Sequence, residues 1–359
     1  MYLYVNGRFL TKTVTGVIRY SLELLRQVDA LLETDTYAGI RVTCLAPPEQ
    51  LIEPGWKNIV IRKVGGNRQN LWEQIDLPLF ARGQVLFSPG NSGPVLHSRQ
   101  VVTLHDASVF AFPGAYSLAF RIKYHMILRM LVRSARLILT VSQFSRQELA
   151  KYLGISNDRF NVIYNGSDHL ACLAPDYQIL ERNHLKKRGY LLTVASNSSH
   201  KNFTSLVSAA RKIHNQDIQF VVVGGTFRRI FQSGGMTDVP ENVQLLGYVN
   251  DNELKALYEN AAGFIFPSLY EGFGLPVLEA MQAGCPVLSA DSASLPEVGG
   301  DAALYFDPLN PDEIASRIDS FLSDPGLRET MRSRGFEQSA RFRWETTARN
   351  TLDKIIHLF

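Results

Sequence analysis

The amino-acid sequence predicts two parallel α/β domains of similar size. Short runs rich in Val, Ile, Leu and Phe alternate with segments of helical periodicity along all 359 residues, a pattern typical of strand–helix–strand units. A chain of this length is also long for a single domain. After the Asn165-Gly166 pair, a polar and basic stretch separates two such halves. We therefore expect two facing Rossmann-like domains with an interdomain cleft.

Hydrophobic periodicity places the expected elements along each half. In the first half, strands are expected over residues 2–5, 41–45, 60–63, 85–87, 101–104, 137–141 and 161–163, with helices over 17–32, 117–134 and 145–153. In the second half, strands are expected over 190–194, 219–223, 243–246, 264–266, 287–289 and 304–306, with helices over 204–214, 252–260, 276–283, 311–323 and from 326 onward. These elements divide the chain into a domain over 1–170, a linker over 171–189, a domain over 190–343 and a final helix over 344–359.

Composition argues against several classes of protein. The formal net charge of +3 and the sequence pI of about 8.7 are too weakly basic to indicate nucleic-acid binding. The chain contains no run of about 18 apolar residues, so no membrane-spanning helix is expected. The first residues lack the basic start and apolar core of a signal peptide. Three scattered cysteines, Cys44, Cys172 and Cys285, fit a reducing compartment. We expect a cytoplasmic protein.

The most informative segment runs from Glu271 to Glu279. Its Gly-rich turn leads to Pro276, which fits the first position of a helix, and Gly284 fits the end of that helix. Apolar runs on both sides place the loop at the carboxyl end of a parallel strand, where ligands bind. Free N–H groups at the helix start suit a phosphate. A carboxylate on the loop and another in the first helical turn suit sugar hydroxyls. Together they indicate a nucleotide sugar, although Glu279 alone also fits a carboxylate that stabilises a helix end.

Further motifs occur near the ends of other expected strands. They are Asn6-Gly-Arg-Phe-Leu, Thr15-Gly-Val-Ile-Arg, Thr103-Leu-His-Asp106, Val162-Ile-Tyr-Asn-Gly166 and His200-Lys-Asn202. With the Glu271–Glu279 segment, their order and spacing resemble the retaining glycosyltransferases of family 4, which have the GT-B fold. The resemblance extends over most of the chain. It implies an acceptor-side domain over 1–170, a nucleotide-sugar-binding domain over 190–343 and a C-terminal helix that crosses back to the first domain.

The resemblance also implies roles for single residues of the second half. Glu271 would bind hydroxyls of the donor sugar, and Glu279 would bind the ribose of the nucleotide. The sugar and diphosphate of the donor would also be bound by backbone N–H groups of Phe273, Gly274 and Leu275. The nucleobase would be bound by Tyr248 and Val249.

Lys201 follows the first expected strand of the second half, where a fixed ammonium can stabilise the diphosphate as it leaves and gains charge. The alternative is a solvated surface lysine. Many family members carry an arginine where this chain has Ser196. Either Ser196 binds a phosphate oxygen without charge, or Arg228 or Arg229 compensates.

In the first half, His105 and Asp106 end an expected strand. The resemblance implies that His105 faces the cleft in a positioning and electrostatic role; the alternative is that Asp106 caps a turn with His105 packed beside it. Gly16 opens the first helix and lets the backbone approach a diphosphate, unless it is a simple turn glycine. Arg19, one turn further, would reach the acceptor or the phosphates. His105, Lys201 and Glu271 form the expected catalytic set.

Basic residues recur at helical spacing in one segment of the first half: Arg121, His125, Arg129, Arg133 and Arg136. This pattern predicts one basic stripe on a helix. One interpretation is that the stripe is a solvated face. The other is that it contacts an anionic membrane, at the inner face of the plasma membrane, or a lipid diphosphate acceptor.

Three missing motifs argue against metal and dinucleotide chemistry. No Asp-x-Asp and no Cys/His cluster is present, so we expect no metal and no cofactor. No Gly-x-Gly-x-x-Gly follows a strand, which argues against a dinucleotide oxidoreductase.

The motifs of the first half most resemble bacterial enzymes that add mannose or D-rhamnose during surface-polysaccharide (O-antigen) assembly. The expected reaction is therefore retaining hexosyl transfer from GDP-mannose, or from a UDP- or dTDP-sugar, to a glycan or polyprenyl-diphosphate-linked acceptor. Both glutamates are assigned to binding and not to two-carboxylate hydrolysis. The rival interpretations are a nucleotide-sugar epimerase of similar fold and a two-lobed sugar-binding protein.

Overall fold

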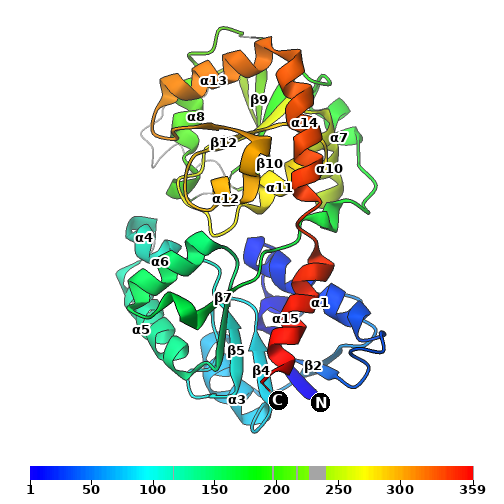
Figure 1. The fold of residues 1–359 in the computed structure, drawn as a ribbon, viewed down its shortest axis with the longest axis vertical. Helices are drawn as coiled ribbons and strands as arrows, with labels where there is room; N and C mark the ends of the chain where they lie inside the picture. Colours follow the sequence, from blue (N-terminus) through cyan, green and yellow to red (C-terminus); the bar gives the residue numbers. More distant parts are fainter. Residues whose placement is uncertain (116, 196–197, 216, 226–239, 359) are drawn as a thin grey trace. The chain divides into compact units, whose positions relative to one another are not determined.

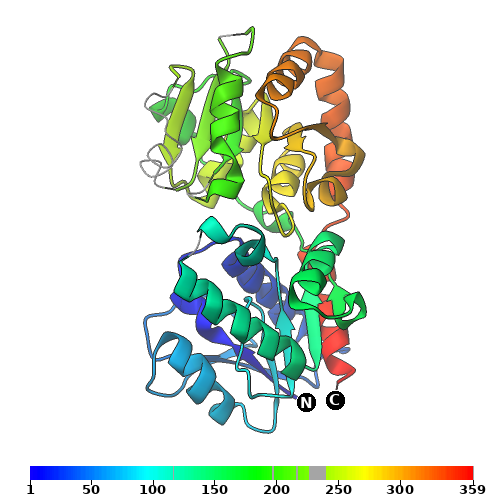
Figure 2. The ribbon, with the colours of Figure 1, turned by 90° about the vertical axis from the view of Figure 1, so that its left-hand side faces the viewer.

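The computed structural model describes residues 1–115, 117–195, 198–215, 217–225 and 240–358. It divides the chain into two compact units (Figure 1). The first unit combines Met1–Gly166 with Arg343–Phe359, and the second unit is Ser167–Phe342. Each unit is a parallel α/β sheet with helices packed on it, which confirms the predicted fold class (Figure 2).

The boundaries differ from the predicted ones, because the stretch 171–189 is not a linker. It belongs to the second unit, where helix α7 (Gln178–Arg182) packs against α10 (Asp251–Asn260). Ile179 of α7 is buried, and Arg182 Nη2 lies 2.5 Å from Glu253 Oε1. One short helix with few apolar residues has too little periodicity to stand out from a polar linker.

The first unit contains a seven-stranded sheet in the order β3-β2-β1-β4-β5-β6-β7. All neighbouring strands run parallel. Every residue of β4 and β5 is buried, as expected for central strands that helices cover on both faces. The strands are β1 (Tyr2–Asn6), β2 (Arg41–Ala46), β3 (Val60–Lys63), β4 (Val85–Ser88), β5 (Gln100–Thr103), β6 (Leu137–Thr140) and β7 (Phe160–Val162).

The C-terminal helix belongs to the first unit, where it lies beside the first helix (Figure 1). Trp344 at its start is fully buried, with its ring centroid 6.1 Å from that of Tyr20. A Cβ on Gly166 would lie 2.1 Å from Trp344 N, so only glycine fits where the chain leaves the unit. The helices are α1 (Gly16–Leu31), α2 (Gln69–Leu71), α3 (Leu77–Phe80), α4 (Ser108–Ala111), α5 (Leu118–Ser134), α6 (Gln143–Leu153) and α15 (Trp344–Ile356).

The second unit contains a six-stranded parallel sheet in the order β10-β9-β8-β11-β12-β13. Its strands are β8 (Tyr190–Val194), β9 (Gln219–Val223), β10 (Val243–Gly247), β11 (Gly263–Phe266), β12 (Val287–Ala290) and β13 (Ala303–Phe306). Besides α7 and α10, its helices among the described residues are α8 (Phe203–Ala210), α11 (Leu275–Gln282), α12 (Leu295–Gly299), α13 (Pro311–Ser323) and α14 (Pro325–Ser339). In both units the strands begin and end within one residue of the predicted ranges.

The strand order reverses once in each sheet, next to the first strand of the unit. In the first unit β1 lies between β2 and β4, and in the second unit β8 lies between β9 and β11. The loops that follow the two strands at such a reversal diverge to opposite faces of the sheet, which leaves a crevice where ligands bind in open α/β sheets. The loops after β8 and β11, and those after β1 and β4, therefore lie where a ligand site is expected.

Candidate active site

The Gly-rich loop after β11 leads into α11, which begins at Leu275, one residue before the predicted start. Gly274 precedes the helix with φ at 96°, and a Cβ there would lie 2.6 Å from Leu295 Cδ2, so this position requires glycine. Gly284 follows the helix with φ at 70°, as predicted for a helix-ending glycine. Glu279 therefore lies beyond the first turn, which contains no acidic residue. Its placement in the first turn, and the helix-end interpretation, are wrong.

Glu279 is instead held between two side chains from other elements. The carboxylate is buried, with His169 Nε2 3.0 Å from Oε1 and Tyr258 Oη donating a hydrogen bond to Oε2 at 3.3 Å. Burial, and then the charge of Glu279, raise the pKa of Tyr258 well above its ordinary value, so the phenol stays a neutral donor. Neither His169 nor Tyr258 was predicted from the sequence, because no local pattern links these distant segments.

Glu271 pairs directly with Lys201 at the strand reversal of the second unit. Lys201 Nζ lies 2.5 Å from Glu271 Oε1, and the two side chains are 19% and 14% exposed. The ammonium also lies 5.2 Å from the ring centroid of Phe266, at the end of β11. Lys201 is therefore not a solvated surface lysine. The sequence predicted both residues for the site, but not their contact.

Hydrogen bonds from side chains to backbone carbonyls join four loops around this pair. Asn202 Nδ2 donates to Pro267 O at 3.1 Å and to Pro308 O at 2.7 Å, which joins the loops after β8, β11 and β13. Ser294 Oγ, from the loop after β12, donates to Glu271 O at 2.9 Å. These bonds satisfy buried carbonyls and fix the path of the loop that carries Glu271.

The other predicted donor-binding residues lie at different places in the second unit. Phe273 is buried and its ring packs edge-on against Phe342, with centroids 5.9 Å apart, whereas Leu275 is half-buried. Tyr248, 79% exposed, and the half-buried Val249 follow the edge strand β10, two strands from β8. Three predicted residues lie outside the described part of the chain: Ser196, Arg228 and Arg229.

His105 in the first unit is buried, and its Nε2 lies 2.8 Å from Pro89 O. Burial lowers the pKa of His105, so the neutral ring donates from Nε2 to that carbonyl at pH 7. Asp106 Oδ1 accepts a hydrogen bond from Ser108 N at 2.8 Å. These contacts fit the alternative in which Asp106 caps a turn and His105 packs beside it. A positioning role for His105, and a substrate contact for Asp106, stay predictions.

Gly16 begins α1, and no atom lies within 4 Å of a Cβ added to it. The first unit itself therefore does not require a glycine at this position. Arg19 lies three residues further along the same helix and is half-buried. The expected contacts of Gly16 and Arg19 with diphosphate or acceptor stay predictions.

The predicted basic stripe of five residues is wrong in part. Arg129 and Arg133 are exposed on α5, but Arg121 and His125 are half-buried, and Arg136 lies beyond the helix end at Ser134. Burial, followed by the charges of Arg129 and Arg121, lowers the pKa of His125, which reduces its contribution to a positive surface. The stripe was predicted from helical spacing alone. The prediction failed in part because spacing does not reveal which face of the helix packs against the core.

A polar pocket at the strand reversal of the first unit was not predicted. Glu73 lies in a π-helical turn (Trp72–Asp76), and its side chain is 2% exposed. Its Oε1 accepts hydrogen bonds from Asn6 Nδ2 and Ser92 Oγ, both at 2.8 Å, and its Oε2 lies 2.7 Å from Arg8 Nη1. The motif at Asn6 was recognised in the sequence, but an isolated π-helical turn has no periodicity by which Glu73 could be found.

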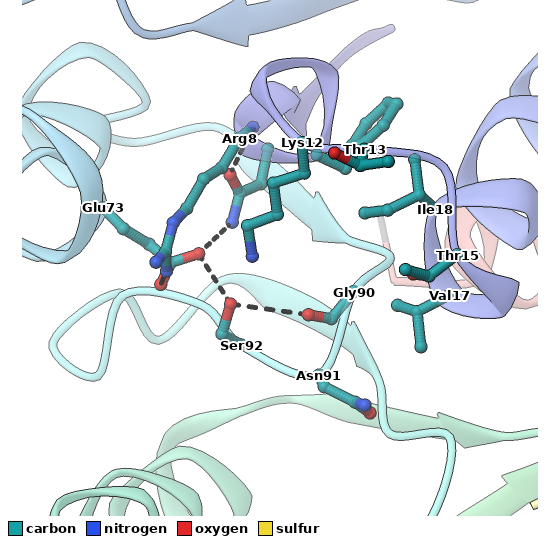
Figure 3. A pocket seen from close by; sticks show the side chains of 12 residues that line it. Arg8, Lys12, Thr13, Thr15, Val17, Ile18, Glu73, Gly90, Asn91 and Ser92 are labelled. Atoms are coloured by element: carbon teal, nitrogen blue, oxygen red, sulfur yellow. Dashed lines mark hydrogen bonds and ion pairs between the residues drawn. The ribbon is translucent and has the colours of Figure 1, made fainter. Parts of the chain in front are cut away.

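The pocket beside Glu73 has a volume of about 310 Å³. Figure 3 shows the side chain of Lys12 pointing into it, with Ser92 and Gly90 on the other side. Burial, and then the charge of Arg8, lower the pKa of Lys12. Two cationic side chains and one carboxylate therefore line the pocket, and hydrogen bonds or ion pairs within the unit already engage both oxygens of that carboxylate.

Among the described residues, no three His, Cys, Asp or Glu side chains lie together in a group that could hold a metal ion. Nor is any helix there both long and apolar enough to cross a membrane.

Sequence comparisons match both halves of the chain to known families. Residues 16–169 match Glycosyltransferase Family 4, and residues 178–338 match Glycosyl transferases group 1. The O-antigen chain mannosyltransferase B of Escherichia coli is 34% identical over 272 residues, which cover 71% of this chain and 69% of that protein. The O-antigen chain mannosyltransferase RfbU of Salmonella typhimurium is 25% identical over 328 residues, 88% of each chain.

Solved structures share the fold over the whole chain. Sucrose-phosphate synthase from Thermosynechococcus elongatus aligns with a TM-score of 0.77 and 18% identity, covering 100% of this chain and 99% of that one. Anabaena HepE in complex with UDP and glucose aligns with a TM-score of 0.75 and 17% identity, covering 99% of each chain. With the family matches and the relative at 34% identity, these likenesses show that the chain belongs to the group 1, family 4 glycosyltransferases and has the GT-B fold.

Proposed function

We propose that this enzyme is a retaining hexosyltransferase that moves mannose from a nucleotide sugar to a glycan or polyprenyl-diphosphate-linked glycan during bacterial surface-polysaccharide assembly. The observation that carries the proposal is the half-buried Lys201–Glu271 pair at the strand reversal of the second unit. GDP-mannose is the first choice of donor, supported by the two O-antigen mannosyltransferases among the relatives. A UDP- or dTDP-sugar is the second choice, and the complex of HepE with UDP and glucose is a reason to test it.

The geometry suits a reaction in which negative charge builds up on a leaving diphosphate. The Lys201 ammonium is held beside Glu271 and the Phe266 ring. A donor would bind with its diphosphate near this ammonium and with hydroxyls of its sugar on the Glu271 carboxylate. The cation then interacts more strongly with the transition state than with the bound donor, which accelerates bond breaking.

The acceptor hydroxyl would attack from the face that the diphosphate leaves, so the stereochemistry is retained. The leaving phosphate takes the proton of that hydroxyl, and no protein base is needed. Neither Glu271, paired with Lys201, nor Glu279, held by His169 and Tyr258, has to act as a nucleophile. A fixed protein cation at the diphosphate also removes the need for a divalent metal ion, so we propose a metal-independent reaction.

A donor panel tests this proposal. GDP-mannose, UDP-glucose, dTDP-rhamnose and the free sugars are compared by thermal shift, since ligand binding to the native state raises Tm. We expect GDP-mannose to give the largest shift, and mannose to be transferred only when an acceptor glycan is added. A shift with UDP- or dTDP-sugars alone would select the second donor. Conversion of the donor without an acceptor would favour an epimerase, and binding of free sugar only would favour a binding protein.

We further propose that α5 brings the enzyme, in the cytoplasm, to an anionic membrane surface. The outward face of this helix combines Ile122, Met126 and Met130, which are 58%, 56% and 43% exposed, with Arg129 and Arg133. The helix contains no acidic residue. Its other face packs into a core cluster through Leu128, Leu131 and Val132. A mixed apolar and basic face suits insertion at the level of anionic lipid headgroups.

A further inference from the structure

We propose that His169 is a positioning residue that orients the Glu279 carboxylate and thereby makes the enzyme select a ribonucleotide over a deoxyribonucleotide donor. The inference rests on the proposed function, because it takes Glu279 as the group that binds the ribose. His169 lies in a short 3₁₀ turn, Asp168–Leu170, immediately after the chain enters the second unit. Its Nε2 lies 3.0 Å from Glu279 Oε1.

The surroundings of Glu279 leave the carboxylate little freedom to rotate. The side chains of His169 and Glu279 are 1% and 9% exposed. Tyr258 holds the other oxygen from α10, and the turn that carries His169 contacts both α10 and α11. A buried carboxylate without such partners would pay a large desolvation penalty. Two separate elements therefore fix its position and its orientation.

This arrangement leaves acceptor capacity for a ligand. An ionised carboxylate has about four lone-pair positions. Tyr258 donates a hydrogen bond to Oε2, and His169 Nε2 lies 3.0 Å from Oε1. The remaining positions can accept hydrogen bonds from the two neighbouring hydroxyls of a ribose. A site built to bind a hydroxyl discriminates strongly against an analogue that lacks it, because a buried acceptor is then left without its donor.

His169 contributes to this discrimination by holding the acceptor in place before the donor binds. Without it, Oε1 loses its partner, and the carboxylate can turn away from the ribose. The Lys201–Glu271 pair shares no residue with the His169–Glu279–Tyr258 cluster. Loss of His169 should therefore weaken binding of the nucleotide without changing the chemistry at the transferred sugar.

The experiment compares a nucleoside diphosphate with its 2′-deoxy form. Calorimetry is performed with the full chain, using GDP or UDP, whichever the donor panel selects. Selection of a dTDP-sugar, whose nucleotide is itself a 2′-deoxyribonucleotide, would overturn the proposal. We expect the wild type to bind the ribonucleotide more tightly than the deoxyribonucleotide by about tenfold or more. In His169→Ala this ratio should fall below about threefold, through weaker binding of the ribonucleotide. His169→Gln keeps an N–H donor and should restore part of the ratio.

Kinetics and a matched control separate positioning from general damage. His169→Ala should raise KM for the donor and leave kcat at saturation within about threefold of wild type. Tyr190→Phe removes the hydrogen bond from another buried side chain of the same unit, to Leu257 O, and should keep the wild-type ratio. If His169→Ala does not fold, the same measurements on His169→Gln and Tyr258→Phe test the proposal, with a ratio below that of wild type expected in both.

Equal weakening of both nucleotides in His169→Ala, with the ratio unchanged, would overturn the proposal, because a merely structural residue would act in that way. Glu279→Gln distinguishes a failure of the ribose assignment of Glu279 from a failure of the positioning role of His169. If Glu279→Gln also keeps the wild-type ratio, the ribose assignment itself is wrong. If Glu279→Gln loses the ratio and His169→Ala keeps it, only the role of His169 fails. If the wild type binds no nucleoside diphosphate, the proposed function fails.

Discussion

At the strand reversal of the first unit, the Glu73 carboxylate is enclosed by Asn6, Ser92 and Arg8 and is 2% exposed. At the corresponding reversal of the second unit, Glu271 has Lys201 as its ion-pair partner, and its side chain is 14% exposed. The first carboxylate is engaged by its own unit, whereas the second keeps acceptor capacity at an accessible position. Equivalent topology thus provides two different kinds of carboxylate, one that supports a pocket and one that can exchange contacts with a substrate.

The largest expected effect tests the accessible carboxylate. Glu271→Ala should lower transfer by about 10³-fold, because the donor sugar loses its hydroxyl acceptor and Lys201 loses the partner that orients it. Thermal unfolding should change less than on loss of a fully enclosed ion pair, since the two side chains, 19% and 14% exposed, keep some access to water. Initial rates and a melting curve on the same preparation measure both effects. Near-normal turnover would contradict the assignment of Glu271 to the donor sugar.

Lys201 is expected to act on the leaving diphosphate. Lys201→Ala should lower kcat and kcat/KM together, by about 10²–10³-fold, as for removal of one preorganised electrostatic contact. Lys201→Arg should recover part of the rate, because it keeps the charge in a different geometry. A rise in KM with kcat within about threefold of wild type would instead mean that Lys201 only anchors the donor.

Loss of the enclosed Glu73 carboxylate in the first unit should lower the stability of the fold more than it lowers turnover. Glu73→Ala should lower the free energy of unfolding by about 3 kcal/mol, because it removes the partner of the buried Asn6 and of Arg8, whose side chain is only 16% exposed. Urea denaturation measures the change. If Glu73→Ala were as stable as Glu271→Ala, the contrast between an enclosed and an accessible carboxylate would be wrong.

The outer helices of the two units offer a second contrast, with a smaller expected effect. The exposed face of α5 carries Arg129 and Arg133, whereas the first turn of α13 carries Asp312 and Glu313. Vesicles with anionic lipid should bind the enzyme, and Arg129→Ala with Arg133→Ala should weaken binding by about 2 kcal/mol, or roughly 30-fold. Arg317→Ala on α13 is the matched control and should have no effect. Equal binding to neutral vesicles, or insensitivity to salt, would favour a solvated face.

The smallest expected effect is that of metal removal. Excess EDTA should leave the transfer rate unchanged, because the proposed stabilisation of the diphosphate comes from Lys201 and not from a divalent ion. Rates are measured after dialysis against EDTA, with and without added Mg²⁺ or Mn²⁺. Loss of activity that either ion restores would contradict the metal-independent mechanism.

Local sequence patterns were sufficient for the strands and for the loops at their carboxyl ends. Most strands are short apolar runs bounded by turn residues, so residues adjacent in the chain determine their limits. The loop from Glu271 to Glu279 was found in the same way, from glycines and a proline next to an apolar run. Short elements were missed: α7 was assigned to a linker, and the turn with Glu73 was not predicted, because three to five residues do not reveal a period.

The partners of the site residues were decided only by the tertiary structure. Lys201 meets Glu271 because β8 and β11, far apart in the chain, are neighbours in the sheet. His169 meets Glu279 because the turn after the unit boundary packs against α11. Helical spacing on α5 likewise predicted positive charge, but only packing decided that Arg121 is half-buried and Met126 exposed. The sequence by itself determined which elements form and which side chains they carry, since those depend on neighbouring residues. Pairing and burial depend on contacts between distant segments, which exist only once the sheet is assembled.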